Sequence, residues 1–212
     1  MRRGCIFDVD GVLLDSIPAY RRAWGAWAVE HDVREAAIWA VAHGRRPLDI
    51  IRAAAGKLNE TASLRRFESL IRTEYEAVEA LDGAHGLLER LPPAAWTTAT
   101  SGNRDLVERA FARLRLPKPH TGVCGEDVSV GKPDPGCYLL AAGRMGMTPS
   151  ECIVIEDAPA GVAAGKAAGM TVIAVTTTHT AKDLREADQV HGSLPEAADA
   201  ILAELGGGAG PG

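Results

Sequence analysis

From residue 94 to residue 175 the chain repeats one pattern: a short apolar run, a few turn residues, then apolar side chains at helical spacing. The apolar runs lie at 94–100, 121–124, 151–156 and 170–175, the helical stretches lie at 104–115, 136–146 and 159–169, and a further run, CIF, precedes Asp8. Strands that alternate with helices form βαβ units, in which parallel strands are covered by helices on both faces. The sequence therefore predicts an α/β fold with a doubly wound, Rossmann-like parallel sheet.

The segment from about residue 17 to residue 90 breaks this pattern, because it contains no convincing strand and is rich in Ala, Arg, Glu and Leu with helical periodicity. We expect residues 17–83 to form a helical cap, inserted into a core made of residues 1–16 and 84–205. The junctions should fall near 15–18 and 80–86. Residues 206–212, GGGAGPG, should be a disordered tail.

Composition narrows the class of protein. Hydrophobic residues make up 46% of the 212 residues and the net charge is −5, so we expect a globular protein without affinity for nucleic acid or anionic membranes. The apolar runs are too short to span a bilayer, and Asp8 and Asp10 interrupt any signal-peptide core. The four cysteines form no C-x-x-C pair, which favours a reduced, cytoplasmic protein over a disulfide scaffold or zinc site.

Two acids mark the end of the first apolar run. Asp8 and Asp10 follow CIF, and Gly11 comes next, where it lets the chain turn tightly. Ligands of doubly wound sheets gather beyond the carboxyl ends of the strands. Two neighbouring carboxylates repel each other, and a magnesium ion, which prefers oxygen ligands, would relieve that repulsion. A solvated acidic turn is the alternative that this stretch alone leaves open.

Three further stretches carry suitable chemistry at comparable positions. Thr100 and Ser101 precede a helix and suit phosphate binding, although the same residues make an ordinary helix cap. Lys132, in SVGKPDP, is either a surface charge or a fixed cation that faces phosphate. Glu156 and Asp157 end a strongly apolar run and again suggest a metal site.

Taken in chain order, the acid pair and the three further stretches resemble the four motifs of the haloacid dehalogenase superfamily. They read FDVDGVLLDS, TATSGNR, GKPDP and VIEDAPAGVAAGKAAGM. The resemblance extends to about residue 205 and is closest to the phosphatases of glycerol phosphate and sugar phosphates. It implies that Asp8 is the nucleophile and Asp10 the general acid and base. It also implies that Thr100, Ser101 and Lys132 bind the phosphoryl group. Mg²⁺ would be held by Asp8, Asp157 and the backbone carbonyl of Asp10, with Glu156 as a direct or water-mediated partner.

The implied activity is magnesium-dependent hydrolysis of small polyol or sugar phosphates through an aspartyl-phosphate, by a monomer or weak dimer. A β-phosphoglucomutase-like hexose phosphate mutase is the alternative within the superfamily, but Tyr20 stands where that enzyme carries a histidine. A non-catalytic binding protein on the same fold is the alternative of another class. Retention of both acid pairs argues against it.

The cap should choose the substrate. The stretch AHGRRPLDIIR resembles the specificity loop of the phosphatases, so the expected specificity residues are His43, Gly44, Arg45 and Arg46. The two arginines are forked donors for hydroxyl or anionic groups, or else solvated loop charges. Asn103 faces the substrate or caps the following helix.

Overall fold

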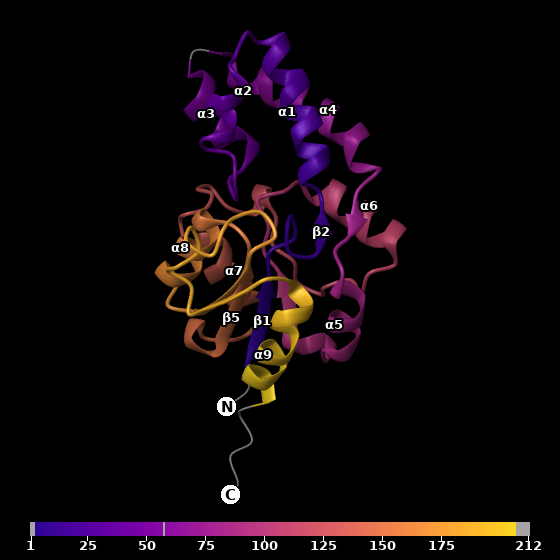
Figure 1. Ribbon diagram of the computed structural model, residues 1–212, viewed down its shortest axis with the longest axis vertical. Helices are drawn as coiled ribbons and strands as arrows, with labels where there is room; N and C mark the ends of the chain where they lie inside the picture. The colour runs from indigo at the N-terminus through magenta and orange to yellow at the C-terminus, as the bar shows by residue number, and fades with distance from the viewer. Residues whose placement is uncertain (1–2, 57, 207–212) are drawn as a thin grey trace, which may run out of the picture.

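The computed structural model describes residues 3–56 and 58–206 and is built on a five-stranded parallel sheet of order β4–β1–β5–β6–β7 (Figure 1). The strands are β1 (Gly4–Phe7), β4 (Trp96–Thr98), β5 (Cys152–Glu156), β6 (Thr171–Val175) and β7 (Gln189–His191). The helices that connect or flank them are α5 (Ala84–Arg90), α6 (Arg104–Leu114), α7 (Gly136–Met145), α8 (Pro159–Ala167) and α9 (Leu194–Gly206). The predicted doubly wound α/β core is confirmed.

The sheet is covered on both faces because successive side chains of each strand point in opposite directions. On β5, Ile153 and Ile155 belong to one hydrophobic cluster, whereas Val154 belongs to a second one on the other face. The first cluster includes residues of α5, α6 and α9, and the second includes residues of α7 and α8. Strands β1 and β5 are buried along their whole length, as their unbroken apolar runs require.

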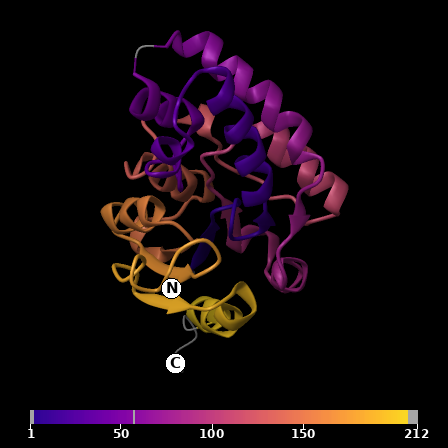
Figure 2. The same cartoon turned by 45° about the horizontal axis from the view of Figure 1, so that its top comes forward.

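Four helices gather at one end of the molecule, beyond the carboxyl ends of the strands, while α9 lies at the opposite end (Figures 1 and 2). They are α1 (Ile17–Glu30), α2 (Glu35–Trp39), α3 (Pro47–Ala55) and α4 (Glu60–Tyr75). An aromatic cluster holds α1 on α4: Trp24 stacks on Phe67 at 3.8 Å between ring centroids, and Trp27 Nε1 donates to Ser63 O at 3.0 Å. The predicted helical cap is present.

A two-stranded antiparallel sheet joins the cap to the core. Strand β2 (Leu14–Asp15) precedes the cap and pairs with β3 (Glu79–Ala80), which follows it. The sequence analysis expected no strand here and is wrong for β3, because two-residue strands carry no periodicity to detect. We propose that this small sheet is the junction between the cap and the core.

Three other details differ from the sequence prediction. Residues 121–124 are not a strand, since Val123 forms only an isolated bridge with Ala99. The half-buried strand β7 was not predicted, because its short polar segment lacks an apolar run. Gly206 ends α9 and does not begin a tail; residues 207–212 lie outside the described residues.

The cysteines behave as predicted: Cys5, Cys124, Cys137 and Cys152 are all buried and free. Among the described residues, no helix is both long and apolar enough to cross a membrane.

The packing of α1 predicts a stability effect. Trp27→Ala should lower the free energy of unfolding by about 3–5 kcal/mol, because it empties a fully buried site in the cap. Val29→Ala, on the same helix but 84% exposed, should change it by less than about 0.5 kcal/mol. Urea unfolding followed by tryptophan fluorescence and circular dichroism would compare the two, and equal effects would contradict the packing of α1.

Candidate active site

The carboxyl ends of three neighbouring strands bring the sequence motifs together. Asp8 directly follows β1, Thr100 lies just beyond β4, and Asp157 directly follows β5. All three side chains are buried, as is Lys132, which lies in the loop before α7. The motifs are far apart in sequence, yet parallel strand order places their ends at one edge.

Three acids at this edge lie close enough to share a cation. Asp8, Glu156 and Asp157 each offer an oxygen atom, and these atoms all lie within 4.8 Å of one another. Burial, opposed by Lys132 and assisted by the charges of Glu156 and Asp10, raises the pKa of Asp8 to about 7. Burial, with the charges of Glu156 and Asp8, also raises the pKa of Asp157 well above its usual range. Without a metal ion, the site therefore favours the protonated carboxyl groups of Asp8 and Asp157. A bound cation would favour their ionised forms.

The geometry around Asp8 and Asp157 fits a hard divalent ion. Asp8 Oδ1 is buried and accepts no hydrogen bond from the described residues, although Lys132 Nζ lies 3.1 Å away. Gly11, at φ +84°, leaves space beside Asp157, because a Cβ atom there would overlap the carboxylate. Asp8 Oδ1 pairs with the Lys132 ammonium but has further lone pairs, and the glycine at position 11 leaves room beside Asp157, so the two carboxylates suit an ion that takes oxygen ligands.

Glu156 is differently occupied. Its Oε1 accepts from Lys132 Nζ and Tyr138 Oη, both at 2.7 Å, and its Oε2 accepts from the backbone N–H groups of Asp157 and Ala158 at 2.9 and 3.1 Å. These four donors fill the lone-pair sites of a carboxylate. Burial raises the pKa of Glu156, but Lys132 and the hydrogen bonds outweigh it, so the net shift is downward. Although its oxygen lies near the other acids, the hydrogen bonds favour a role in positioning Lys132 over direct metal binding.

Lys132 is thus a buried cation held between two acids. Its Nζ also lies 4.9 Å from the centroid of the Tyr138 ring. Burial lowers the pKa of Lys132, but Asp8 and Glu156 more than offset this, so the pKa is raised and the ammonium persists. The sequence analysis missed Tyr138, because nothing in the sequence pairs a tyrosine of α7 with an acid of β5.

Asp10 is held from two directions. Its Oδ1 accepts from Tyr75 Oη at 2.7 Å, and its Oδ2 accepts from Thr100 Oγ1 at 3.3 Å. Thr100 Oγ1 in turn accepts from the N–H of Gly102 at 2.9 Å. Tyr75 is the last residue of α4, so a helix of the cap contacts one of the two acids of the first motif. The sequence analysis did not predict this contact.

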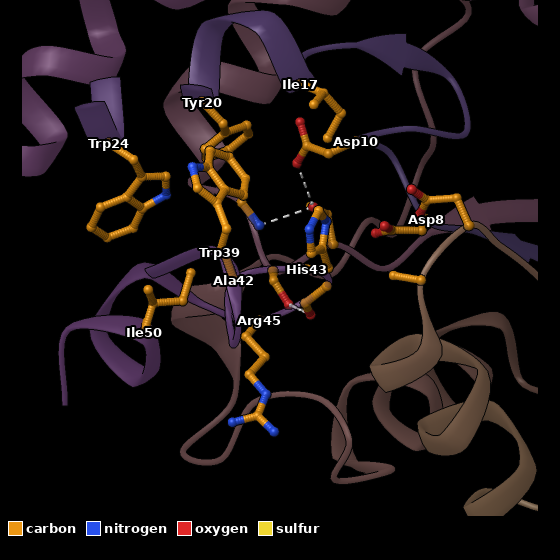
Figure 3. Close-up of a pocket in the computed structure, with 16 residues that line it drawn as sticks. Asp8, Asp10, Ile17, Tyr20, Trp24, Trp39, Ala42, His43, Arg45 and Ile50 are labelled. Carbon is orange, nitrogen blue, oxygen red and sulfur yellow. Dashed lines mark hydrogen bonds between the residues drawn. The ribbon is translucent and has the colours of Figure 1, made fainter. Parts of the chain in front are cut away.

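A small cavity lies over these acids (Figure 3). The core contributes Asp8, Asp10, Thr100, Ser101, Gly102, Asp157 and Ala158, and the cap side contributes Ile17, Tyr20, Trp24, Trp39, Ala42, His43, Gly44, Arg45 and Ile50. One end is therefore acidic and rich in hydroxyl groups, whereas the other is aromatic with one guanidinium.

The expected specificity residues divide into two groups. His43, Gly44 and Arg45 line the cavity, and Gly44 O accepts from Ser101 Oγ at 2.8 Å. Arg46 lies outside it and binds Asp49 together with the carbonyl oxygens of Val128 and Ser129, which links the cap to the loop before Lys132. Asn103 also lies outside this cavity and caps α6 by accepting from the N–H groups of Asp105 and Leu106.

His43 meets a second histidine at the cap–core boundary. Its ring lies edge-on to that of His179, with 4.4 Å between the centroids. Burial, helped by the nearby charges of His179 and Arg21, lowers the pKa of His43. A neutral imidazole therefore faces the cavity at pH 7, where it can both donate and accept hydrogen bonds.

Comparison with known proteins agrees with this geometry. Residues 3–169 match the haloacid dehalogenase-like hydrolase family. The chain belongs to this family. It is 40% identical to hexitol phosphatase A of Escherichia coli over 92% of both chains, and 34% identical to glycerol-1-phosphate phosphohydrolase 2 of Saccharomyces cerevisiae over 85% of this chain and 77% of that one. With named phosphatases among its full-length relatives, this family member is a phosphoric monoester hydrolase.

Solved structures show the same fold. A hydrolase from Pseudomonas syringae superposes with a TM-score of 0.83 at 25% identity, covering 95% of this chain and 98% of that one. A β-phosphoglucomutase from Clostridium difficile superposes with a TM-score of 0.85 at 18% identity, covering 98% of each chain. The second likeness concerns the fold alone, so it does not favour a mutase.

The raised pKa of Asp8 predicts a pH effect on the metal-free enzyme. Because the folded-state pKa of about 7 exceeds the ordinary value of 3.8, the contribution of Asp8 to stability should be fully present below pH 4 and be lost as the pH rises toward 7. The loss should approach about 1.4 kcal/mol per pH unit from this group. Asp8→Asn should remove that slope in chelator-treated protein, as measured by urea unfolding at several pH values. Asp15→Asn, at an exposed position, controls for loss of a carboxylate, and equal slopes in wild type and Asp8→Asn would refute the assignment.

Proposed function

We propose that this enzyme hydrolyses phosphate monoesters of small polyols or sugars, through a phosphorylated Asp8 and with bound Mg²⁺. The carrying observation is the convergence of Asp8, Asp10, Thr100 and Asp157 at one end of a cavity whose other end is aromatic and basic, with Lys132 paired to Asp8 behind it. Hexitol, glycerol-1-phosphate and fructose-1-phosphate phosphatases among the relatives support this substrate class.

In the first step, an oxygen of Asp8 attacks phosphorus and the bond to the ester oxygen breaks. Asp10 gives its proton to that oxygen, so the alcohol leaves neutral. Lys132 stabilises charge on Asp8 and on the phosphoryl oxygens, and Thr100 and Ser101 donate hydrogen bonds to them. In the second step, Asp10 takes a proton from water, whose oxygen attacks phosphorus while the bond to Asp8 breaks. Inorganic phosphate leaves, and both acids return to their starting states.

The carboxylates of Asp8 and Asp157, with the backbone carbonyl of Asp10, would hold the Mg²⁺ ion. When bound, the ion offsets the repulsion between the attacking carboxylate and the phosphate dianion. Glu156 acts one step further back, because its hydrogen bonds keep the Lys132 ammonium near Asp8.

We further propose that the cap comprises residues 17–83 and selects the substrate. Tyr20 and Trp39, both half-buried, offer ring surface to the carbon skeleton of a sugar or polyol, and the buried Trp24 forms part of the cavity wall behind them. Arg45 is half-buried, and its guanidinium has no ion-pair partner among the described residues, so it remains free to bind hydroxyl groups.

Phosphate release from a panel of esters tests the proposed function. Glycerol phosphates, hexitol phosphates, 2-deoxyglucose 6-phosphate and β-glucose 1-phosphate would be assayed with Mg²⁺ and with chelator. Release should require Mg²⁺ and concentrate on a polyol or sugar ester, and Asp8→Asn should reduce it by at least about a thousandfold. Asp15→Asn is the matched control at an exposed position. If no ester released phosphate while β-glucose 1-phosphate became the 6-phosphate, the enzyme would be a mutase.

A separate prediction concerns Arg45. Arg45→Ala should raise KM for the preferred polyol or sugar phosphate by roughly tenfold, because a charge-assisted hydrogen bond contributes about 1.5–3 kcal/mol. KM for p-nitrophenyl phosphate, which lacks hydroxyl groups, should change by less than about threefold. Arg52→Ala, an exposed arginine of α3 paired with Glu60, provides the control. Equal changes in KM for both substrates would exclude recognition of hydroxyl groups by Arg45.

A further inference from the structure

The contact between Tyr75 and Asp10 crosses from the cap to the catalytic loop. Tyr75 is 4% exposed, and its hydroxyl donates to Asp10 Oδ1 at 2.7 Å. The two residues are 65 positions apart and come from the end of α4 and the loop after β1. Tyr20, on α1 of the cap, also lies beside Asp10: burial together with the charge and side-chain hydrogen bonding of Asp10 raises the pKa of Tyr20.

The hydrogen bond from Tyr75 determines which oxygen of the Asp10 carboxylate is left for proton transfer. Oδ1 is engaged by Tyr75, whereas Oδ2 lies at the phosphate-binding side, 3.3 Å from Thr100 Oγ1. Burial and the charge of Asp10 raise the pKa of Tyr75, so its hydroxyl stays protonated and acts as a donor. The carboxylate therefore presents Oδ2 on the side of Thr100, the residue proposed to bind the phosphoryl group.

The aromatic cluster of the cap holds Tyr75 in place. Its ring meets Tyr20 edge-on at 6.2 Å, Tyr20 stacks near Phe67 at 6.3 Å, and Phe67 stacks on Trp24. The hydroxyl therefore follows the position of α1 and α4. A displacement of these helices away from the core would remove it from Asp10.

We propose that Tyr75 is a positioning residue for proton transfer, which makes acid–base catalysis by Asp10 depend on the cap being seated on the core. This inference rests on the proposed phosphatase mechanism and adds a residue that the four sequence motifs do not contain. It implies that loss of the hydroxyl harms esters with a poor leaving group far more than esters with a good one. A poor leaving group needs the proton of Asp10, whereas p-nitrophenolate leaves without it.

The test compares kcat/KM of Tyr75→Phe on two substrates, the preferred polyol or sugar phosphate and p-nitrophenyl phosphate. This ratio reports the steps up to and including the first phosphoryl transfer, so the common second step does not obscure it. We expect a loss of at least about tenfold on the alcohol ester and less than about threefold on p-nitrophenyl phosphate, as a part of the 10²–10⁴-fold typical of acid–base catalysis. Equal losses on both substrates would mean that Tyr75 only packs, and would overturn the inference.

Ile71→Val is the matched control, because it disturbs the buried face of α4 one turn before Tyr75 while leaving the aromatic cluster and the hydroxyl group in place. It should leave the ratio between the two substrates unchanged, whatever its effect on each. A second variant, Tyr75→His, keeps an N–H donor and should recover part of the alcohol-ester activity. If Tyr75→His recovered no activity, and if each of the three variants lost activity equally on both substrates, Tyr75 would have a packing role.

Rapid mixing with p-nitrophenyl phosphate supplies a second measurement. Since Asp10 is also the base of the second step, Tyr75→Phe should show a burst of p-nitrophenol followed by slower turnover, as the phosphoenzyme accumulates. Absence of a larger burst than in the wild type would contradict the proposed role in that step. If the wild type hydrolysed neither substrate, the proposed function would fail, and this outcome is distinct from equal losses in the variant.

Discussion

The concentration of negative charge at the ends of parallel strands is the constraint on which the rest of this structure depends. Asp8, Glu156 and Asp157 are buried within a few ångströms of one another, where isolated carboxylates are strongly disfavoured. Lys132 neutralises part of this charge and is itself kept in place by Glu156. The core strands hold these side chains together in spite of their mutual repulsion. Three acids face one lysine, so a bound cation would balance the remaining negative charge.

Much of this arrangement could be predicted from the sequence, because the acids directly follow apolar runs and the parallel topology brings strand ends together. The βαβ core and the places of Asp8, Thr100 and Asp157 at the strand ends follow from such local patterns. Contacts such as Tyr75 with Asp10 could not be predicted, because they join side chains far apart in sequence that neither periodicity nor spacing relates. The two-residue strands β2 and β3 could not be predicted either, because such short strands form by pairing with each other and show no sequence pattern of their own.

The cap loop that holds Arg45 and Arg46 shows why residue type alone assigns roles poorly. Arg45 and Arg46 are adjacent and chemically identical, yet one lines the cavity while the other binds Asp49 and two carbonyl oxygens of the core. A helix begins at the next residue, Pro47, so the two side chains leave the chain in different directions. Contacts between the cap and the core close the cavity and define its shape. One of them is the hydrogen bond from Ser101 Oγ to Gly44 O.

The chain enters and leaves the cap at almost the same point. Leu14 pairs with Ala80, and the N–H of Leu81 donates to Leu13 O at 2.9 Å, so the ends of the insertion are already bridged by backbone hydrogen bonds. An insertion of this kind can be lengthened, shortened or exchanged without altering the register of the sheet that carries Asp8 and Asp157. Under the proposed function, selection for a new substrate can thus act largely on one module, provided that the altered cap keeps the contact of Tyr75 with Asp10.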